Sequence, residues 1–297
     1  MLIQVNSGES IQNIIDSIQH HQVVIYLKNG IYREKILIDK PNITLVGEEK
    51  GKVILVWSDA SGTLMREDSA KTYGTSGSAT VTLTSNAKGF KAENIVFKND
   101  FDYPKSFLKD KQAVALKNDA DQSLFIECEF LGYQDTLYAN KGRQYYKDSY
   151  IEGNVDFIFG GAQAYFENCN IFSKKRDEGI GYIIAPSTLY NQEIGYIFNN
   201  CKFDSDGENN TIFIGRPWHP GKRTGYNPSA IVMNSYLGSH IKENGWDSMS
   251  GFSPDDARFY EYNNYGEGSV INIKRRVLLK EEIEKYSKEK LFKDWNI

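Results

Sequence analysis

The chain has 297 residues and a formal net charge of −4, and 40 % of its residues are hydrophobic. Its basic clusters, such as Lys174–Arg176, are short, so the charge pattern of a nucleic-acid-binding protein is missing. The N-terminal segment lacks the basic and apolar regions of a signal peptide, and no apolar run reaches membrane-spanning length. As the sequence stands we expect a cytoplasmic protein that does not bind membranes, whereas removal of a leader would make it a secreted one.

The first predicted element is a short N-terminal helix. Ile11, Ile14, Ile15 and Ile18 are spaced as on one face of a helix, and Ser10 directly before them is a suitable N-cap. Such a helix would cover the first coil of a repetitive fold, which needs a cap at its ends.

A four-residue sequence motif, here called a tetrad, recurs through the middle of the chain. It contains a small or polar pair followed by an apolar residue. Successive tetrads end either 20 or 21 positions apart or 32 to 34 positions apart, a period typical of a solenoid. The surrounding β-branched and aromatic residues favour strands, so the sequence predicts an all-β parallel β-helix. Because a solenoid grows along one axis, residues 1–297 are expected to form a single domain. The tetrads are Asn94–Phe97, Glu127–Phe130, Asp148–Ile151, Asn168–Ile171, Asn200–Phe203 and Asn234–Leu237.

The three cysteines all occupy the second position of a tetrad. Cys128, Cys169 and Cys201 stand where Ser149 and Ser235 stand in other tetrads, which indicates a ladder of small side chains pointing inward. A metal site or a redox pair is the functional alternative, but neither shows its usual two-residue spacing.

Two aspartates lie one short repeat apart. Asp135 and Asp156 are separated by 21 positions, and Gln112 and Gln134 by 22, so stacked coils would bring them to one face. Two acids in one cleft can take different protonation states, and side-chain amides can donate hydrogen bonds to an oxyanion. Later in the chain, Arg216 could keep one carboxylate ionised and Trp218 could offer a flat platform to a sugar ring. This set of residues is that of an acyl-transfer site without serine or histidine.

The last third of the chain is predicted to be less regular. Residues 205–253 are rich in Gly, Asn and Pro and are expected to form loops, where binding elements often lie. From Leu279 to Leu291 the pattern is again helical, and we expect this segment to lie against the solenoid.

Six short motifs follow one another along the chain: Gly30-Ile-Tyr-Arg-Glu34, Gln112-Ala-Val-Ala-Leu116, Gly132-Tyr-Gln-Asp-Thr-Leu-Tyr138, Val155-Asp-Phe-Ile-Phe-Gly160, Ile214-Gly-Arg-Pro-Trp218 and Glu261-Tyr-Asn-Asn264. They resemble, in sequence and order, those of the pectin methylesterase family, and the resemblance covers nearly the whole chain. It implies a right-handed parallel β-helix with short terminal helices that hydrolyses the methyl esters of galacturonate units, without a metal or cofactor.

The resemblance also implies a role for each site residue. Asp156 is similar to the nucleophile and Asp135 to the acid and base, and Arg216 to the residue that keeps the nucleophile charged. Gln112 and Gln134 would stabilise the oxyanion. The sugar subsites would be lined by Trp218, Phe159, Val155 and Tyr138. The expected partner is methylated pectin or an oligogalacturonide, and the protein is expected to act as a monomer.

Small departures from the family pattern concern positions beside these groups. Lys117 follows Gln112-Ala-Val-Ala-Leu116 where arginine is frequent, Ile214 replaces a leucine, and Met249 stands where a second tryptophan is frequent after Gly245-Trp246. None removes a proposed catalytic group, so they bear on subsite preference.

Other interpretations of the same residues stay open. The aspartates could be turn residues and the glutamines a structural amide ladder. A pectin-cleaving glycosidase or a lyase, with Asp119 and Asp121 as calcium ligands, could also display paired acids. A noncatalytic carbohydrate-binding solenoid is the alternative from another class. Reaction products would separate these alternatives, because an esterase alone releases methanol without shortening the polymer.

Overall fold

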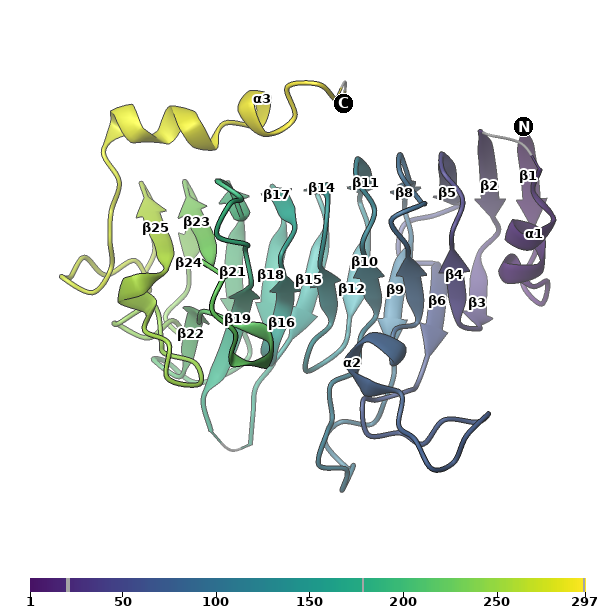
Figure 1. The fold of residues 1–297 in the computed structure, drawn as a ribbon, viewed down its shortest axis with the longest axis horizontal. Helices are drawn as coiled ribbons and strands as arrows, with labels where there is room; N and C mark the ends of the chain where they lie inside the picture. The colour runs from purple at the N-terminus through teal and green to yellow at the C-terminus, as the bar shows by residue number, and fades with distance from the viewer. Residues whose placement is uncertain (20–21, 178, 296) are drawn as a thin grey trace.

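The computed structural model describes residues 1–19, 22–177, 179–295 and 297, whose strands stack along one long axis (Figure 1). They form three parallel sheets in a right-handed parallel β-helix, as the sequence predicts. The largest sheet contains β1 (Leu2–Val5), β2 (Val23–Leu27), β5 (Ile43–Gly47), β8 (Lys91–Glu93), β11 (Ser123–Ile126), β14 (Arg143–Lys147), β17 (Gln163–Glu167), β20 (Tyr196–Asn199), β23 (Ser229–Met233) and β25 (Arg258–Tyr262).

The two other sheets complete each coil. The second contains β3 (Gly30–Arg33), β6 (Val53–Trp57), β9 (Val96–Asn99), β12 (Glu129–Leu131), β15 (Tyr150–Gly153), β18 (Asn170–Ser173), β21 (Lys202–Ser205) and β24 (Tyr236–Leu237). The third contains β4 (Ile36–Ile38), β7 (Val81–Leu83), β10 (Leu116–Asn118), β13 (Leu137–Ala139), β16 (Val155–Gly160), β19 (Gly181–Pro186) and β22 (Ile212–Gly215). We call this third sheet the site sheet.

The core is a column of side chains stacked in register from coil to coil. Parallel pairing aligns Phe125, Tyr146, Phe166 and Phe198 on four successive strands. Their rings stack with centroid distances of 4.8, 4.7 and 4.4 Å. Each such contact contributes about 0.5–1.5 kcal/mol beyond the burial of its area, so the repeat stabilises itself along the axis.

The tetrads are the turns between the first and second sheets. The first residue of every tetrad has a positive φ, between 50° and 58°, a conformation that Asn and Asp tolerate better than most residues. The second residue is buried, so the inward ladder of Cys128, Cys169 and Cys201 with Ser149 and Ser235 is confirmed, and the cysteines are free thiols. The tetrad is therefore a tight turn leading into a strand, and only its second half is extended.

The predicted N-terminal helix is present as α1 (Ile11–Ser17), and Ser10 caps it by accepting a hydrogen bond from the Asn13 amide. Glu34, from the first motif, accepts hydrogen bonds from the Ile11 and Gln12 amides and so ties the helix to the first coils. Tyr32 donates to the Lys28 carbonyl. Both residues of that motif therefore stabilise the scaffold.

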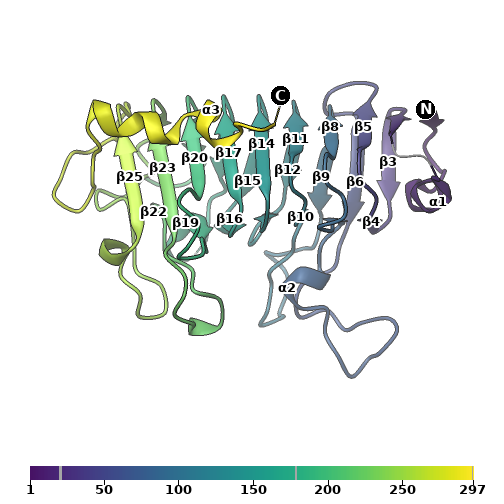
Figure 2. The same ribbon diagram turned by 45° about the horizontal axis from the view of Figure 1, so that its top comes forward.

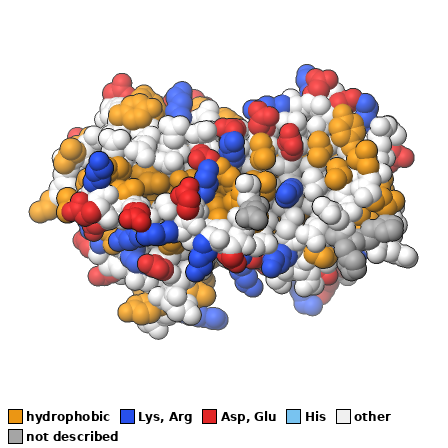
Figure 3. Space-filling view, turned by 90° about the horizontal axis from the view of Figure 1, so that it is seen from above, with side chains coloured by type: hydrophobic (Ala, Val, Ile, Leu, Met, Phe, Trp, Pro, Cys, Tyr) orange, Lys and Arg blue, Asp and Glu red, His pale blue; other side chains and the backbone are white. Residues whose placement is uncertain are grey.

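The C-terminal segment differs from the single helix predicted. It forms the 3₁₀ helix η3 (Lys280–Tyr286) and the α-helix α3 (Lys288–Leu291), because Ser287 between them is extended and caps α3. The segment lies across the outer face of the first sheet (Figure 1), where Phe292 packs with Tyr145 and Tyr286 packs with Tyr260. Seen from above, basic and acidic side chains are interspersed with hydrophobic ones on this face (Figure 3).

Residues 205–253 are more regular than predicted. The apolar runs 212–215 and 229–233 are strands, and Tyr236–Leu237 is a third, because each pairs with the preceding coil. The remaining helices are α2 (Gly74–Gly77), η1 (Pro220–Lys222) and η2 (Pro254–Asp256). Loops that carry α2 and loops that follow β22 project from the same side of the stack (Figure 2). Among the described residues, no helix combines the length and the apolar character that crossing a membrane requires.

Candidate active site

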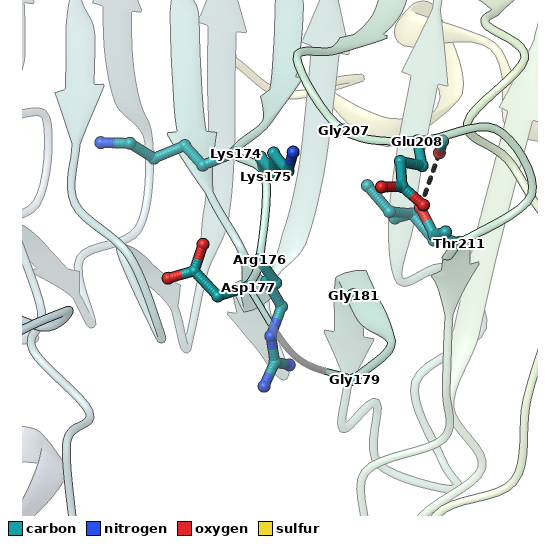
Figure 4. A pocket seen from close by; sticks show the side chains of 10 residues that line it. Lys174, Lys175, Arg176, Asp177, Gly179, Gly181, Gly207, Glu208 and Thr211 are labelled. Carbon is teal, nitrogen blue, oxygen red and sulfur yellow. Dashed lines mark hydrogen bonds between the residues drawn. The ribbon is translucent and has the colours of Figure 1, made fainter.

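A cavity of about 430 Å³ lies over the site sheet, and every site residue predicted from the sequence lines it except Val155. The cavity is lined by Thr75, Ser76, Gln112, Gln134, Asp135, Tyr138, Asp156, Phe159, Ala185, Arg216, Trp218 and Met249. Another hollow, of about 370 Å³, lies between the loop that carries Lys174 and Arg176 and the one that carries Glu208 (Figure 4). It contains none of the predicted residues.

The register of the site sheet brings the two aspartates to adjacent coils. Leu137 pairs with Ile158, so Asp135 and Asp156, each two residues earlier, occupy equivalent places. The Asp135 amide donates to the Val155 carbonyl at 3.1 Å. One coil before, the Ala113 amide donates to the Gln134 carbonyl at 3.0 Å, so Gln112 joins the same face.

Both aspartates have a positive φ, 64° at Asp135 and 47° at Asp156, as the first residues of the tetrads do, and Asp tolerates this conformation better than most residues. The glycine three positions earlier allows the tight turn in each motif. A Cβ on Gly153 would lie 2.2 Å from the Cβ of Phe157, and one on Gly132 would lie 2.7 Å from the Thr136 hydroxyl oxygen.

Asp156 is held by Arg216. The Arg216 Nε donates to Oδ1 at 2.9 Å and Nη2 donates to Oδ2 at 2.6 Å, a bidentate pair that fixes the carboxylate plane. Burial raises the pKa of Asp156, and the hydrogen bonds and charge of Arg216 oppose that rise. More weakly, the charge of Arg176 acts in the same direction as Arg216.

Asp135 has a different environment. Its residue is only 8 % exposed, and its carboxyl group makes no hydrogen bond with any described residue. Burial, and then repulsion by Asp156, hold the pKa of Asp135 well above its usual range. The pair can therefore contain one ionised and one protonated carboxyl group at the same pH.

Gln112 and Gln134 both line the cavity. The Gln112 Oε1 is buried without a hydrogen-bond partner among the described residues, which leaves its Nε2 as the amide atom that can face the cavity. An amide N–H is a donor suited to an oxyanion.

The oxyanion role that the resemblance implies for Gln112 and Gln134 predicts that replacing either with alanine lowers kcat by about 10²–10³-fold, because an oxyanion donor acts mainly in the transition state. Steady-state kinetics on a methylated oligogalacturonide, the substrate that the resemblance implies, measure this effect. A matched change at Gln163, which lies on β17 outside the cavity, serves as the control. An increase in KM with unchanged kcat would instead identify the two amides as ground-state binding groups.

Three aromatic side chains form one wall of the cavity. Tyr138 and Phe159 stack at 4.1 Å, and the Trp218 ring lies 5.6 Å from that of Phe159 at an angle of 60°. Ala185 pairs with Phe159 on the neighbouring strand of the site sheet. Its small side chain leaves space in the cavity at this coil.

The sugar-binding role that the resemblance implies for Trp218 predicts that Trp218→Ala raises KM about tenfold with a smaller change in kcat, because a stacked sugar face is held in ground state and transition state alike. The same steady-state assay separates the two constants, with Trp57→Ala, a tryptophan outside the cavity, as the control. A loss confined to kcat would contradict a stacking role.

Val155 is the predicted site residue that does not line the cavity. It is buried in the site sheet, where it pairs with Gln134 and Tyr182, and it does not line the cavity. Sequence reasoning did not single out Ala185, whose place follows only from strand register. Nor did it single out Thr75 and Ser76, which lie on α2, and Met249 was noted only as a departure from the family pattern.

The proposed calcium ligands are engaged by cations. Asp119 lies 3.3 Å from Lys117 and Asp121 lies 2.8 Å from Arg143. Over the described part of the chain, no group of three or more His, Cys, Asp and Glu side chains could hold a metal ion.

Comparison with known proteins agrees with this geometry. The family model described as Pectinesterase matches residues 5–293. Pectinesterase A of Dickeya chrysanthemi is 35 % identical, over 98 % of this chain and 89 % of its own length. A crystal structure of a pectin methylesterase in complex with a hexasaccharide has a TM-score of 0.92 at 32 % identity, covering 99 % of this chain and 97 % of its own. The pectin methylesterase from Yersinia enterocolitica has a TM-score of 0.91 at 36 % identity, covering 97 % of this chain and 100 % of its own.

Proposed function

Because the chain belongs to the pectinesterase family and is a carboxylic ester hydrolase, we propose that it releases methanol from methylated galacturonate units through two aspartates. The observation that carries this proposal is the contrast within one cavity: Asp156 is paired with Arg216, whereas the Asp135 carboxyl group has no hydrogen-bond partner among the described residues. We further propose that residues 1–297 act as a single-domain monomer without a metal or cofactor.

In the first step Asp156 is the nucleophile. Its carboxylate oxygen attacks the ester carbonyl carbon, and the carbonyl oxygen becomes an oxyanion that accepts hydrogen bonds from Gln112 and Gln134. The bond to the methoxy oxygen then breaks as that oxygen takes the proton of Asp135. Methanol leaves, and the galacturonyl group remains on Asp156 as an anhydride.

In the second step Asp135, now ionised, is the base. It takes a proton from a water molecule while the water oxygen attacks the galacturonyl carbonyl. The anhydride bond breaks, the sugar leaves with a free carboxyl group, and Asp156 returns as a carboxylate paired with Arg216. Asp135 is protonated again, so the cycle closes without an external acid.

Pectin is the substrate that the family relationship supports. A relative was crystallised with a hexasaccharide, which suits a cavity open over the stacked coils. For this chain we propose polymeric pectin or a methylated oligogalacturonide bound against Tyr138, Phe159 and Trp218.

The competing functions give other products. A glycosidase releases reducing ends and a lyase gives an unsaturated product, and neither needs two amide donors beside the acids. Highly methylated pectin incubated with the protein should release methanol without new chain ends. New reducing ends or an unsaturated product would move the assignment to a depolymerase, and no reaction on polymer or oligomer would move it to a binding solenoid.

A further inference from the structure

Arg216, which pairs with the proposed nucleophile Asp156, also contacts an aromatic ring. The guanidinium carbon of Arg216 lies 3.7 Å from the centre of the Tyr182 ring, while its nitrogens bind Asp156. A planar cation stacked on an aromatic face loses freedom to rotate out of the plane of the carboxylate it binds.

Tyr182 is fixed on both sides. Its hydroxyl group donates a 2.9 Å hydrogen bond to Asp247, and its ring stacks on Phe213 in the next coil at 5.7 Å and 11°. Strand register sets this row, since Tyr182 pairs with Val155 on one side and with Phe213 on the other.

Asp247 belongs to the coil after that. Its amide donates to the Gly215 carbonyl at 3.0 Å, so its backbone is anchored to the strand that precedes Arg216. Neither Tyr182 nor Asp247 lines the candidate cavity, so the contacts of this pair are with Arg216 and its strand.

We propose that Tyr182 and Asp247 are positioning residues that hold the Arg216 guanidinium in the plane of the Asp156 carboxylate, an inference that rests on the function proposed for that carboxylate. The chain of contacts runs from the Asp247 carboxylate through the Tyr182 hydroxyl and ring to Arg216, and from Arg216 to Asp156. When it is broken, Arg216 keeps its charge but binds Asp156 in a wider range of orientations.

The pKa of Asp156 depends on the charged groups around Asp156 and Arg216. Asp156 faces Arg216, Asp135 and, at longer range, Arg176. Arg216 faces Asp156, Tyr182 and Asp247. A looser Arg216 opposes the effect of burial less, so the pKa of Asp156 rises and the acid limb of the kcat/KM profile moves to higher pH.

Four variants dissect the chain of contacts. Asp247→Ala and Tyr182→Phe remove the hydrogen bond, and each is expected to lower kcat about tenfold with KM changed less than about twofold. Tyr182→Ala also removes the ring and is expected to lower kcat about 30-fold. Asp247→Asn keeps an oxygen that accepts from the Tyr182 hydroxyl group, so it should restore most of the activity lost in Asp247→Ala. The acid limb should move with kcat across the four.

Tyr236→Phe is the matched control. Tyr236, on the second sheet, donates a 2.9 Å hydrogen bond to Glu267, which is likewise a phenol–carboxylate pair, and no described arginine lies on its ring. Removing this hydrogen bond should change neither kcat nor the pH profile from those of the wild type.

Titration of the Asp156 carboxyl carbon by NMR gives a readout that needs no turnover. A higher Asp156 pKa in Tyr182→Phe and Asp247→Ala supports the proposal, even if the wild type releases no methanol and the proposed function fails. An unmoved Asp156 titration in these variants overturns it, and so does a rise in KM with unchanged kcat, which would make the pair substrate contacts. Tyr182→Phe and Asp247→Asn conserve shape, so the test survives if an alanine variant does not fold.

Discussion

Replacing Asp156 with alanine is expected to abolish methanol release, with a loss of at least about 10⁴-fold in kcat. Without the carboxylate no covalent intermediate can form, and Gln112 and Gln134 can only stabilise a direct attack by water. The measurement is methanol released from highly methylated pectin at matched protein concentrations, with reducing ends assayed in parallel. Circular dichroism should show the β spectrum of the wild type, because alanine leaves the strand hydrogen bonds of β16 in place.

Asp148 provides the control for this variant. It is another aspartate with a positive φ, 50°, but it belongs to a tetrad turn outside the cavity. Asp148→Ala therefore carries the same change of side chain and of backbone preference, and it should keep the rate of wild type. A variant at Asp156 that retains a rate near wild type would exclude covalent catalysis by this residue and leave Asp135 as the acid among the described residues that line the cavity.

The position of the site could be predicted because the fold is repetitive. In a stack of parallel coils a spacing of 21 residues becomes one step along the axis, so Asp135 and Asp156 can be placed together without knowing any loop. The ladder of small residues followed from the same argument, since the second position of each tetrad points inward whichever coil it belongs to.

Other features depended on information that no repeat carries. Residues 212–215 and 229–233 form strands because they pair with the preceding coil. The Gly and Pro residues around them are typical of loops, so the local sequence does not reveal this pairing. Ser287 divides the C-terminal segment because its side chain caps the helix that follows, a local choice that overrides the helical pattern. Val155 fits the family motif, but the structure buries it in the site sheet beside Gln134 and Tyr182, at the register shift that accompanies the positive φ of Asp156, and a motif does not reveal such a shift.

Replacing Asp135 with asparagine is expected to lower kcat by about 10²–10⁴-fold and, at the same time, to stabilise the folded protein at neutral pH. Activity falls because the amide cannot give a proton to the methoxy group or take one from water. In the wild type, activity should decline at acid pH as Asp156 is protonated and at alkaline pH as Asp135 is ionised, since the first step needs one carboxylate and one carboxylic acid. The asparagine variant should lose the alkaline limb together with most of its rate.

The gain in stability follows from the raised pKa of Asp135. Above a pH of about 4 the carboxyl group ionises freely in the unfolded chain but stays protonated in the folded one, so the free energy of unfolding falls as pH rises, until the folded group ionises too. Asparagine removes this cost, and the variant should exceed the wild type by about 1–2 kcal/mol at pH 7, with no difference well below pH 4. Urea unfolding at pH 3, 5 and 7 measures both ends of this range. A variant less stable than the wild type at pH 7 would mean that the folded protein stabilises the Asp135 carboxylate, and such a group could not serve as the acid of the first step.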